Sequence, residues 1–538
     1  MILILGVFLR IASLGADPDW RLDWNPGLLT DEAFYAHNAR NLALFGQTRL
    51  DEFNNMILSP IVHGLQVLVV KAFGVGYIPI RAISVAMSLM GIALFGRLLF
   101  LMFRNSAIAW LGAAWLAIDH AALLFSRTAL LETPVAFFCV ASAWALAEAA
   151  HRSNRPLAVL SAVLAVCAIA TKSTAVAFLI GLLVAAWPMR EIRRPFAVGM
   201  LSALAVWVGL WVLPNWDEWA HMQRYYLAVQ GRPKDLWGQW LAIQRGVFGE
   251  RYGLSYFMML HAPIVWGLAV LLAAALASGG LWNRLSGLER LAVVWFWLTW
   301  AQMALIRVSP TRYMAAAWPA LVICAIVLVA RWPEVRAALS QRTKRAILAR
   351  SLGFAWLIYL LSLAFMPTYQ WRALRYPALE PDFQIRLLAF AVLLGWLIAL
   401  AVPRLRLTWR WTTPALLAIA IFLNARWLTT YFSDLRYEIA EKDATISSRL
   451  PTGSVLQGVA FESPFRYFFT FKGLCNWRQP PEALGATHLL LLGTDETVTQ
   501  KQFDALERWE ELADISGVEQ RLFSGDVGPY QYVVYDAP

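Results

Sequence analysis

Charged residues are scarce in this chain. Asp, Glu, Lys and Arg make up only 15% of its 538 residues, whereas 59% are hydrophobic and the mean hydropathy is +0.54. Soluble globular chains carry about 25% charged residues, and disordered chains are poor in apolar ones. The composition therefore excludes both an ordinary soluble protein and a disordered one.

Cysteine is also rare. The four cysteines, Cys139, Cys167, Cys324 and Cys475, are far apart, and three lie in apolar runs. They form neither a disulfide framework nor a metal-ligand spacing. The first residues, MILILGVFLRIASLG, lack the basic leader and cleavage site of a signal peptide, so we interpret them as a short first membrane span.

Long apolar runs are what the chain has in abundance. A membrane-spanning helix needs about 20 apolar residues, and short spans need support from neighbouring helices or a thinner bilayer. We predict an all-α polytopic membrane protein with thirteen spans, at 1–15, 79–101, 107–124, 134–149, 157–170, 173–187, 196–213, 258–277, 291–306, 314–330, 351–366, 386–402 and 412–430.

Basic residues predict the orientation of these spans. The net charge is +11, and arginines gather in alternate short loops, for example at 190–194 and 331–350. By the positive-inside rule these loops face the cytoplasm. Basic residues spread over loops do not form the stripe of a nucleic-acid-binding domain, so we expect membrane lipids and no nucleic acid as partners. The excess of Arg over Lys favours a GC-rich bacterial genome, and hence the inner (plasma) membrane.

This orientation requires that the apolar stretch 60–73 does not cross the membrane. It is short and contains His63 and Lys71, which suits an interfacial helix. Residues 16–78 then form one outer, extracytoplasmic loop, with a juxtamembrane helix over 31–46 that begins at Asp31.

The C-terminal segment is also predicted to lie outside, in the periplasm of a bacterium. Its runs shorten and turn residues appear, so we divide the chain into a transmembrane domain, 1–430, and a small α/β domain, 431–538. The short apolar runs predict strands at 455–460, 488–493 and 530–536, and the segment KQFDALERWEEL predicts a helix at 501–512.

Three outer clusters of charged residues need an explanation. Thr30, Asp31 and Glu32 open the first outer helix, where they could act as its N-cap and complement its dipole. Arg127 and Glu132, with Ser126, lie at the outer mouth between two spans, where an exposed ion pair would contribute little. Carboxylates at membrane depth are nonetheless candidates for function.

Lys172 is the third feature, the single charge in a run of about thirty residues. It could extend harmlessly to the interface, or its ammonium, beside Thr171, Ser173 and Thr174, could bind a lipid-linked phosphate. Four further outer arginines could add to such an anion site: Arg245, Arg251, Arg307 and Arg312. Acids that accept a proton and cations that hold a phosphate are the groups needed for group transfer from a lipid-phosphate carrier.

Four segments resemble motifs of the GT-C membrane glycosyltransferases, in particular the branch of protein O-mannosyltransferases and lipid A aminoarabinose transferases. DEAFYAHNAR is similar to the acidic segment of their first outer loop, and SRTALLETP to that of their second. AIATKSTAVAFL resembles their L-T-K segment, and TRYMAAAWPALVI their R-Y-x-x-P span. The order of the pieces and the outer C-terminal domain agree, so the resemblance covers nearly the whole chain.

The resemblance implies transfer of a sugar from a polyprenyl-phosphate carrier to a lipid, glycan or protein acceptor outside the cytoplasm, with inversion at the anomeric carbon. It makes Asp31 the catalytic carboxylate and Glu132 a second acid. The candidates for substrate binding are Glu32, Tyr35, His63, Arg127, Lys172, Arg312 and Tyr313.

Two departures from the family pattern stand out. Ser59 replaces a basic residue before Pro60-Ile61, with His63 as a nearby substitute, and Glu132 stands where Asp is usual. Ser59 thereby puts the phosphate contact and a lipid A acceptor in doubt.

Several alternatives stay open on sequence alone. No cofactor is required, although a divalent metal bridging Asp31 and the phosphate is compatible with the sequence. A transporter of lipid-linked sugar and an O-antigen ligase or polymerase are the rival functions. Outer-loop aromatic residues could stack on sugar or prenyl groups, or only form an interfacial belt: Trp216, Trp219, Tyr225, Tyr226, Trp237 and Trp240. Asp217 and Glu218 are an alternative carboxylate pair.

Overall fold

The computed structural model describes most of the chain. The described residues are 2–19, 22, 27–48, 54–229, 254–304, 311–341, 343–363, 391–392, 394–395, 409–451, 454–458, 472–475, 487–493, 521–527 and 530–536. Within some of these stretches only the backbone is described, for example at residues 27–31.

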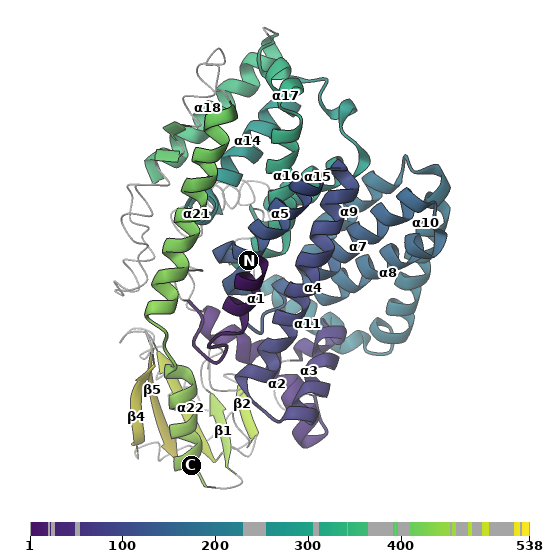
Figure 1. Cartoon of the computed structure of the whole chain (residues 1–538). Coiled ribbons are helices and arrows are strands. Elements are labelled where there is room, and N and C mark those ends of the chain that lie inside the picture. The colour runs from purple at the N-terminus through teal and green to yellow at the C-terminus, as the bar shows by residue number, and fades with distance from the viewer. Residues whose placement is uncertain are drawn as a thin grey trace.

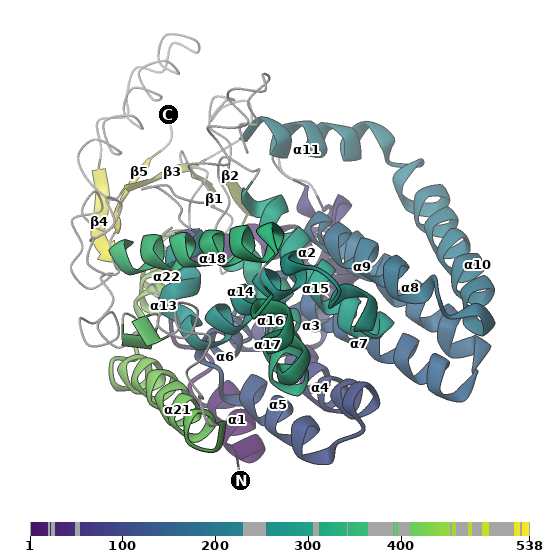
Figure 2. The ribbon, with the colours of Figure 1, turned by 90° about the horizontal axis from the view of Figure 1, so that it is seen from above.

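The transmembrane part is a bundle of apolar helices (Figures 1 and 2). Seen from above, α16 lies near its middle and α10 at its edge (Figure 2). Four described helices are long and apolar enough to cross a membrane, at Tyr77–Phe103, Glu132–Arg152, Arg190–Val212 and Arg312–Ala330. Several other apolar helices are shorter, so the number of thirteen spans stays a prediction.

Most predicted spans overlap described helices, with ends shifted by several residues, whereas the span predicted over 386–402 lies mostly outside the described residues. The helices have the bounds given next. In chain order they are α1 Ile2–Ile11, α2 Gly27–Phe45, α3 Pro60–Phe73, α4 Tyr77–Phe103, α5 Ser106–Ile118, α6 His120–Phe125, α7 Glu132–Arg152, α8 Arg155–Thr171, α9 Val176–Ala186, α10 Arg190–Trp207, α11 Trp216–Val229, α13 Leu254–His261, α14 Pro263–Ser278, α15 Gly287–Ala304, α16 Trp318–Ala330, α17 Trp332–Leu339, α18 Lys344–Leu363, α21 Trp409–Ser433 and α22 Glu438–Arg449.

Two predictions of helix position are corrected. The helix predicted over 31–46 begins at Gly27, because Leu28 and Leu29 extend it, so Asp31 lies inside α2 and is not its cap. The span predicted over 107–124 is broken at Asp119, which ends α5 and accepts a hydrogen bond from the Ala122 N–H to cap α6.

Short helical connections lie at one end of several spans. The 3₁₀ helices η3, Ser173–Ala175, and η6, Thr311–Ala317, precede α9 and α16, and a π-helical turn, η4, Val208–Val212, continues α10. In Figure 1, α2 and α3 lie at the same end of the bundle as the C-terminal sheet, and α17 lies at the opposite end. The side of the membrane that each end faces stays a prediction.

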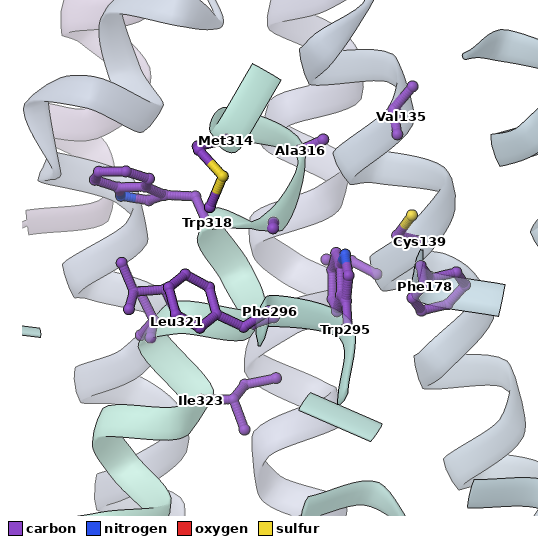
Figure 3. Packing of buried hydrophobic residues seen from close by; sticks show 14 of the residues in the cluster. Val135, Cys139, Phe178, Trp295, Phe296, Met314, Ala316, Trp318, Leu321 and Ile323 are labelled. Atoms are coloured by element: carbon purple, nitrogen blue, oxygen red, sulfur yellow. The ribbon is translucent and has the colours of Figure 1, made fainter. Parts of the chain in front are cut away.

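The core of the bundle is built from close contacts between large and small apolar residues. Figure 3 shows Trp295 and Phe296 of α15 beside residues of α7, α9 and α16. The rings of Phe178 and Trp295 meet edge to face with centroids 4.9 Å apart. This packing fixes the helices whose ends form the candidate site.

The C-terminal residues contain a five-stranded sheet of order β2-β1-β3-β5-β4. β1 is parallel to both β2 and β3, whereas β5 is antiparallel to β3 and β4. Three strands match the predicted ones, and the helix predicted at 501–512 lies outside the described residues. The strands are β1 Val455–Gly458, β2 Lys472–Cys475, β3 His488–Gly493, β4 Arg521–Val527 and β5 Tyr530–Asp536. A separate domain 431–538 stays a prediction.

Candidate active site

A pocket of about 450 Å³ lies where the ends of several helices meet. One part of its wall is apolar and includes Trp207, the last residue of α10 before the π-helical turn. The other part carries an ammonium, hydroxyl groups and amides. The lining residues are Tyr35, Asn55, Leu58, Ser59, Leu131, Ile169, Thr171, Lys172, Ser173, Thr174, Val176, Trp207, Trp219, Gln223, Gln302 and Tyr313.

Lys172 and Glu132 form an ion pair at this pocket. The Lys172 Nζ donates a hydrogen bond to Glu132 Oε1 over 2.6 Å, and the two side chains are 12% and 1% exposed. Lys172 is the C-cap of α8, and Glu132 is the first residue of α7. The Arg312 Nε lies 4.0 Å from the same carboxylate oxygen. Three of the segments that resemble family motifs therefore meet at the Glu132 carboxylate: SRTALLETP, AIATKSTAVAFL and TRYMAAAWPALVI.

Two aromatic rings flank the ammonium group. The Lys172 Nζ lies 3.7 Å from the ring centroid of Tyr313 and 5.5 Å from that of Tyr35. Such contacts attract a cation to the face of the ring. Tyr35 belongs to α2, and Asp31 precedes it by four residues, which places the backbone of Asp31 one turn away on the same face of the helix.

Glu32 makes its contacts with the protein and not with the pocket. Both its oxygens accept hydrogen bonds from Arg81, at 2.8 and 2.6 Å, and its Oε1 also accepts one from the Ala129 N–H. Arg81 in turn donates to the carbonyl oxygens of Leu14 and Ala16. This buried group joins α2, α4 and the loop before α7, and so positions the helix that carries Asp31.

Sequence reasoning missed Arg81. The signal for it was a charged residue near the end of a predicted span, where an ionisable side chain needs a partner. Which acid would pair with it could not be inferred, because Glu32 is 49 residues away in the chain.

Arg127 is likewise held by the protein. Its guanidinium donates hydrogen bonds to three carbonyl oxygens after or near the end of α1, those of Leu9, Ala12 and Ser13. It also lies over the rings of Tyr431 and Phe432. Arg127 does not line the pocket, so it fixes the end of α1 instead of facing a ligand there.

His63 is buried in α3 and is not among the residues that line the pocket. Its Nδ1 shares a hydrogen bond with Gln66 Oε1 over 2.7 Å. Burial lowers the pKa of His63 to about 4, although the bond to Gln66 partly opposes this shift, so the imidazole is neutral near pH 7. Ser59 does line the pocket, and its hydroxyl donates to the Thr171 carbonyl.

Other sequence candidates fall in two groups. Trp219 lines the pocket and stacks on Trp216 with ring centroids 5.7 Å apart, whereas Glu218 accepts a hydrogen bond from Asn54. Outside the described residues, or with side chains that are not described, lie Asp31, Tyr226, Trp237, Trp240, Arg245, Arg251 and Arg307. Among the described residues, no three His, Cys, Asp or Glu side chains come together as metal ligands.

Comparison with known proteins gives a match in structure only. No protein-family model matches the sequence, and no curated protein does so. The crystal structure of ArnT from Cupriavidus metallidurans in the apo state has a TM-score of 0.58 at 15% identity, over 100% of this chain and 97% of that one. The structure of the same ArnT bound to undecaprenyl phosphate has a TM-score of 0.56 at 14% identity, with the same coverage.

At this level of identity the match concerns the fold, and it extends over the whole chain. The chain therefore has a helical, multi-pass membrane fold like that of ArnT.

Proposed function

We propose that the protein is an inverting glycosyltransferase that moves a monosaccharide from a polyprenyl-phosphate carrier to an acceptor outside the cytoplasm. The observation that carries the proposal is the Lys172–Glu132 pair at the wall of a 450 Å³ pocket, beside Tyr35 on the helix that carries Asp31. The likeness in fold to an ArnT bound to undecaprenyl phosphate supports the choice of carrier.

In the proposed reaction Asp31 acts as the general base. The acceptor hydroxyl oxygen bonds to the anomeric carbon while the bond from that carbon to the phosphate oxygen breaks, and the proton goes to Asp31. A single in-line displacement inverts the carbon, in contrast to the covalent two-step route of retaining glycosidases. An acceptor that is already ionised needs no base, and Asp31 would then orient it.

The cations serve the leaving group. Negative charge develops on the carrier phosphate as the bond breaks, and fixed positive groups stabilise it. Lys172 lines the pocket, and the Arg312 Nε lies 4.0 Å from Glu132 Oε1. We therefore assign both cations to the stabilisation of the leaving phosphate. Glu132 orients the acceptor or the donor. Glu32 and Arg127, whose hydrogen bonds go to protein groups, hold the helices in place.

The apolar wall fits the rest of the donor. Trp207 and Trp219 offer flat faces for a sugar ring, and Leu58, Ile169 and Val176 offer contacts for the first prenyl units. Tryptophan also occurs at membrane interfaces without a ligand, so the sugar contact is the part of the proposal that needs its own test.

Transfer and transport are distinguished by the fate of the carrier. Purified protein in proteoliposomes would be given undecaprenyl-phosphate sugar and a cell-envelope acceptor fraction, and free undecaprenyl phosphate would be measured. Transfer releases one free carrier for each sugar moved. Movement of intact sugar-lipid without free carrier would refute the proposal in favour of a transporter. Mass spectrometry of lipids and glycans from a deletion strain would then identify the sugar and the acceptor.

A further inference from the structure

Three features of the pocket fit poorly with a rigid phosphate site. Lys172, the cation that lines the pocket, already donates to Glu132 at 2.6 Å. The second oxygen of Glu132, Oε2, is buried and accepts no hydrogen bond within the described part of the chain. The Thr174 hydroxyl, at the pocket wall, is also buried and unpartnered there. The pocket wall thus carries an ammonium that is already paired with a carboxylate, beside polar atoms that have no hydrogen bond within the described residues.

A phosphate that enters the pocket competes with Glu132 for the ammonium. Lys172 has a long, flexible side chain and three N–H donors, and it is the more exposed partner, at 12% against 1%. Arg312 lies 4.0 Å from Glu132 Oε1 and remains close to the carboxylate if the ammonium turns away. The geometry therefore allows Lys172 to change partners without leaving a buried carboxylate far from any positive charge.

We propose that Lys172 is a latch, a side chain that holds Glu132 through their ion pair and moves to the donor phosphate when the donor binds. Glu132 is then released to meet the acceptor only after the donor is in place, so the donor binds first. This inference rests on the proposed function, because it takes the anion to be the phosphate of a polyprenyl carrier.

The latch makes an unusual prediction for the binding of undecaprenyl phosphate alone. If phosphate must take Lys172 from Glu132, removal of the negative charge in E132Q should tighten binding, by about tenfold for a charged hydrogen bond of ordinary strength. With a fixed, structural ion pair, E132Q acts on phosphate binding only through the lost negative charge of Glu132, an effect that K172M does not remove. E148Q is the matched control, because Glu148 lies near the other end of α7, paired with Arg97 and Arg152.

The full experiment is a double-mutant cycle measured with undecaprenyl phosphate and, as the neutral probe, undecaprenol. K172M should weaken phosphate binding, and E132Q added to K172M should have no further effect. If E132Q still tightens binding in the K172M background, the competition runs through Arg312 and the Lys172 latch is wrong. Undecaprenol should bind all variants equally.

The outcomes separate this inference from the proposed function. Wild-type protein that binds undecaprenyl phosphate no better than undecaprenol overturns both. Phosphate-dependent binding by the wild type without tightening in E132Q overturns the latch alone. Should E132Q fail to fold, the wild-type structure with undecaprenyl phosphate decides. The latch predicts that the 2.6 Å contact between Lys172 Nζ and Glu132 Oε1 opens, and an intact contact contradicts it.

Discussion

The buried pair of Arg81 and Glu32 gives a prediction about stability. Their side chains are 2% and 4% exposed, and two hydrogen bonds of 2.8 and 2.6 Å join them. In R81M the Glu32 carboxylate would remain buried with the Ala129 N–H as its one hydrogen-bond donor among the described residues. Removal of one partner of such a pair destabilises a protein by about 3–5 kcal/mol.

A control pair lies towards the other end of α4. Arg97 is 40% exposed and bonds to Glu148, which also pairs with Arg152 over 2.5 Å. R97M therefore leaves Glu148 with a partner and should cost less than about 1 kcal/mol. In the double variant E32Q/R81M the uncompensated charge is gone, so much of the loss in R81M should be recovered.

The assay is equilibrium unfolding in mixed detergent micelles with increasing dodecyl sulfate, followed by tryptophan fluorescence. The expected order of unfolding free energy is wild type, R97M, E32Q/R81M and R81M, from highest to lowest. Equal stability of R81M and R97M would show that Glu32 finds another partner or water, and the assignment of Arg81 as the residue that positions α2 would be lost.

Two further predictions each compare two positions whose surroundings differ. A Cβ at Gly6 would lie 2.7 Å from the Ala117 carbonyl oxygen, whereas a Cβ at Gly64 would meet no atom within 4 Å. In the same unfolding assay, G6A should therefore lower the unfolding free energy, and G64A should raise it by up to about 1 kcal/mol. The Thr171 hydroxyl donates a hydrogen bond to the Cys167 carbonyl, whereas the Thr174 hydroxyl makes no hydrogen bond within the described residues. T171V should therefore lower the unfolding free energy by about 1 kcal/mol, and T174V should leave it unchanged. T174V should instead weaken undecaprenyl phosphate binding several-fold, and equal effects of the two changes on stability would contradict the assignment.

Much of the fold followed from local patterns in the sequence. Long apolar runs predicted the positions of most described helices, and short apolar runs bounded by turn residues predicted β1, β3 and β5, because both signals depend on residues near each other in the chain. Breaks inside apolar runs were harder to predict. Asp119 ends α5 by capping α6, and that role depends on its fit to a turn within an otherwise apolar stretch.

The site was predictable in part. Glu132, Lys172 and Arg312 were each singled out by their charge at the ends of apolar runs, and the structure brings the three together. The partners of Glu32 and Arg127 could not be inferred, because they come from segments 49 or more residues away. A charged residue near a membrane surface indicates that its side chain needs a partner. The sequence does not indicate whether that partner is another residue of the protein or a ligand.

The central claim is that Asp31 removes the acceptor proton in a pocket where a polyprenyl phosphate departs. The most direct test compares release of free undecaprenyl phosphate, in the presence of acceptor, by wild type, D31N and D434N, the last changing an exposed carboxylate directly after α21. General-base catalysis contributes about 10²–10⁴-fold, so D31N should fold, bind undecaprenyl phosphate and lose at least about a hundredfold in rate, with D434N unchanged. A folded D31N protein that keeps more than about a tenth of the wild-type rate would contradict the claim.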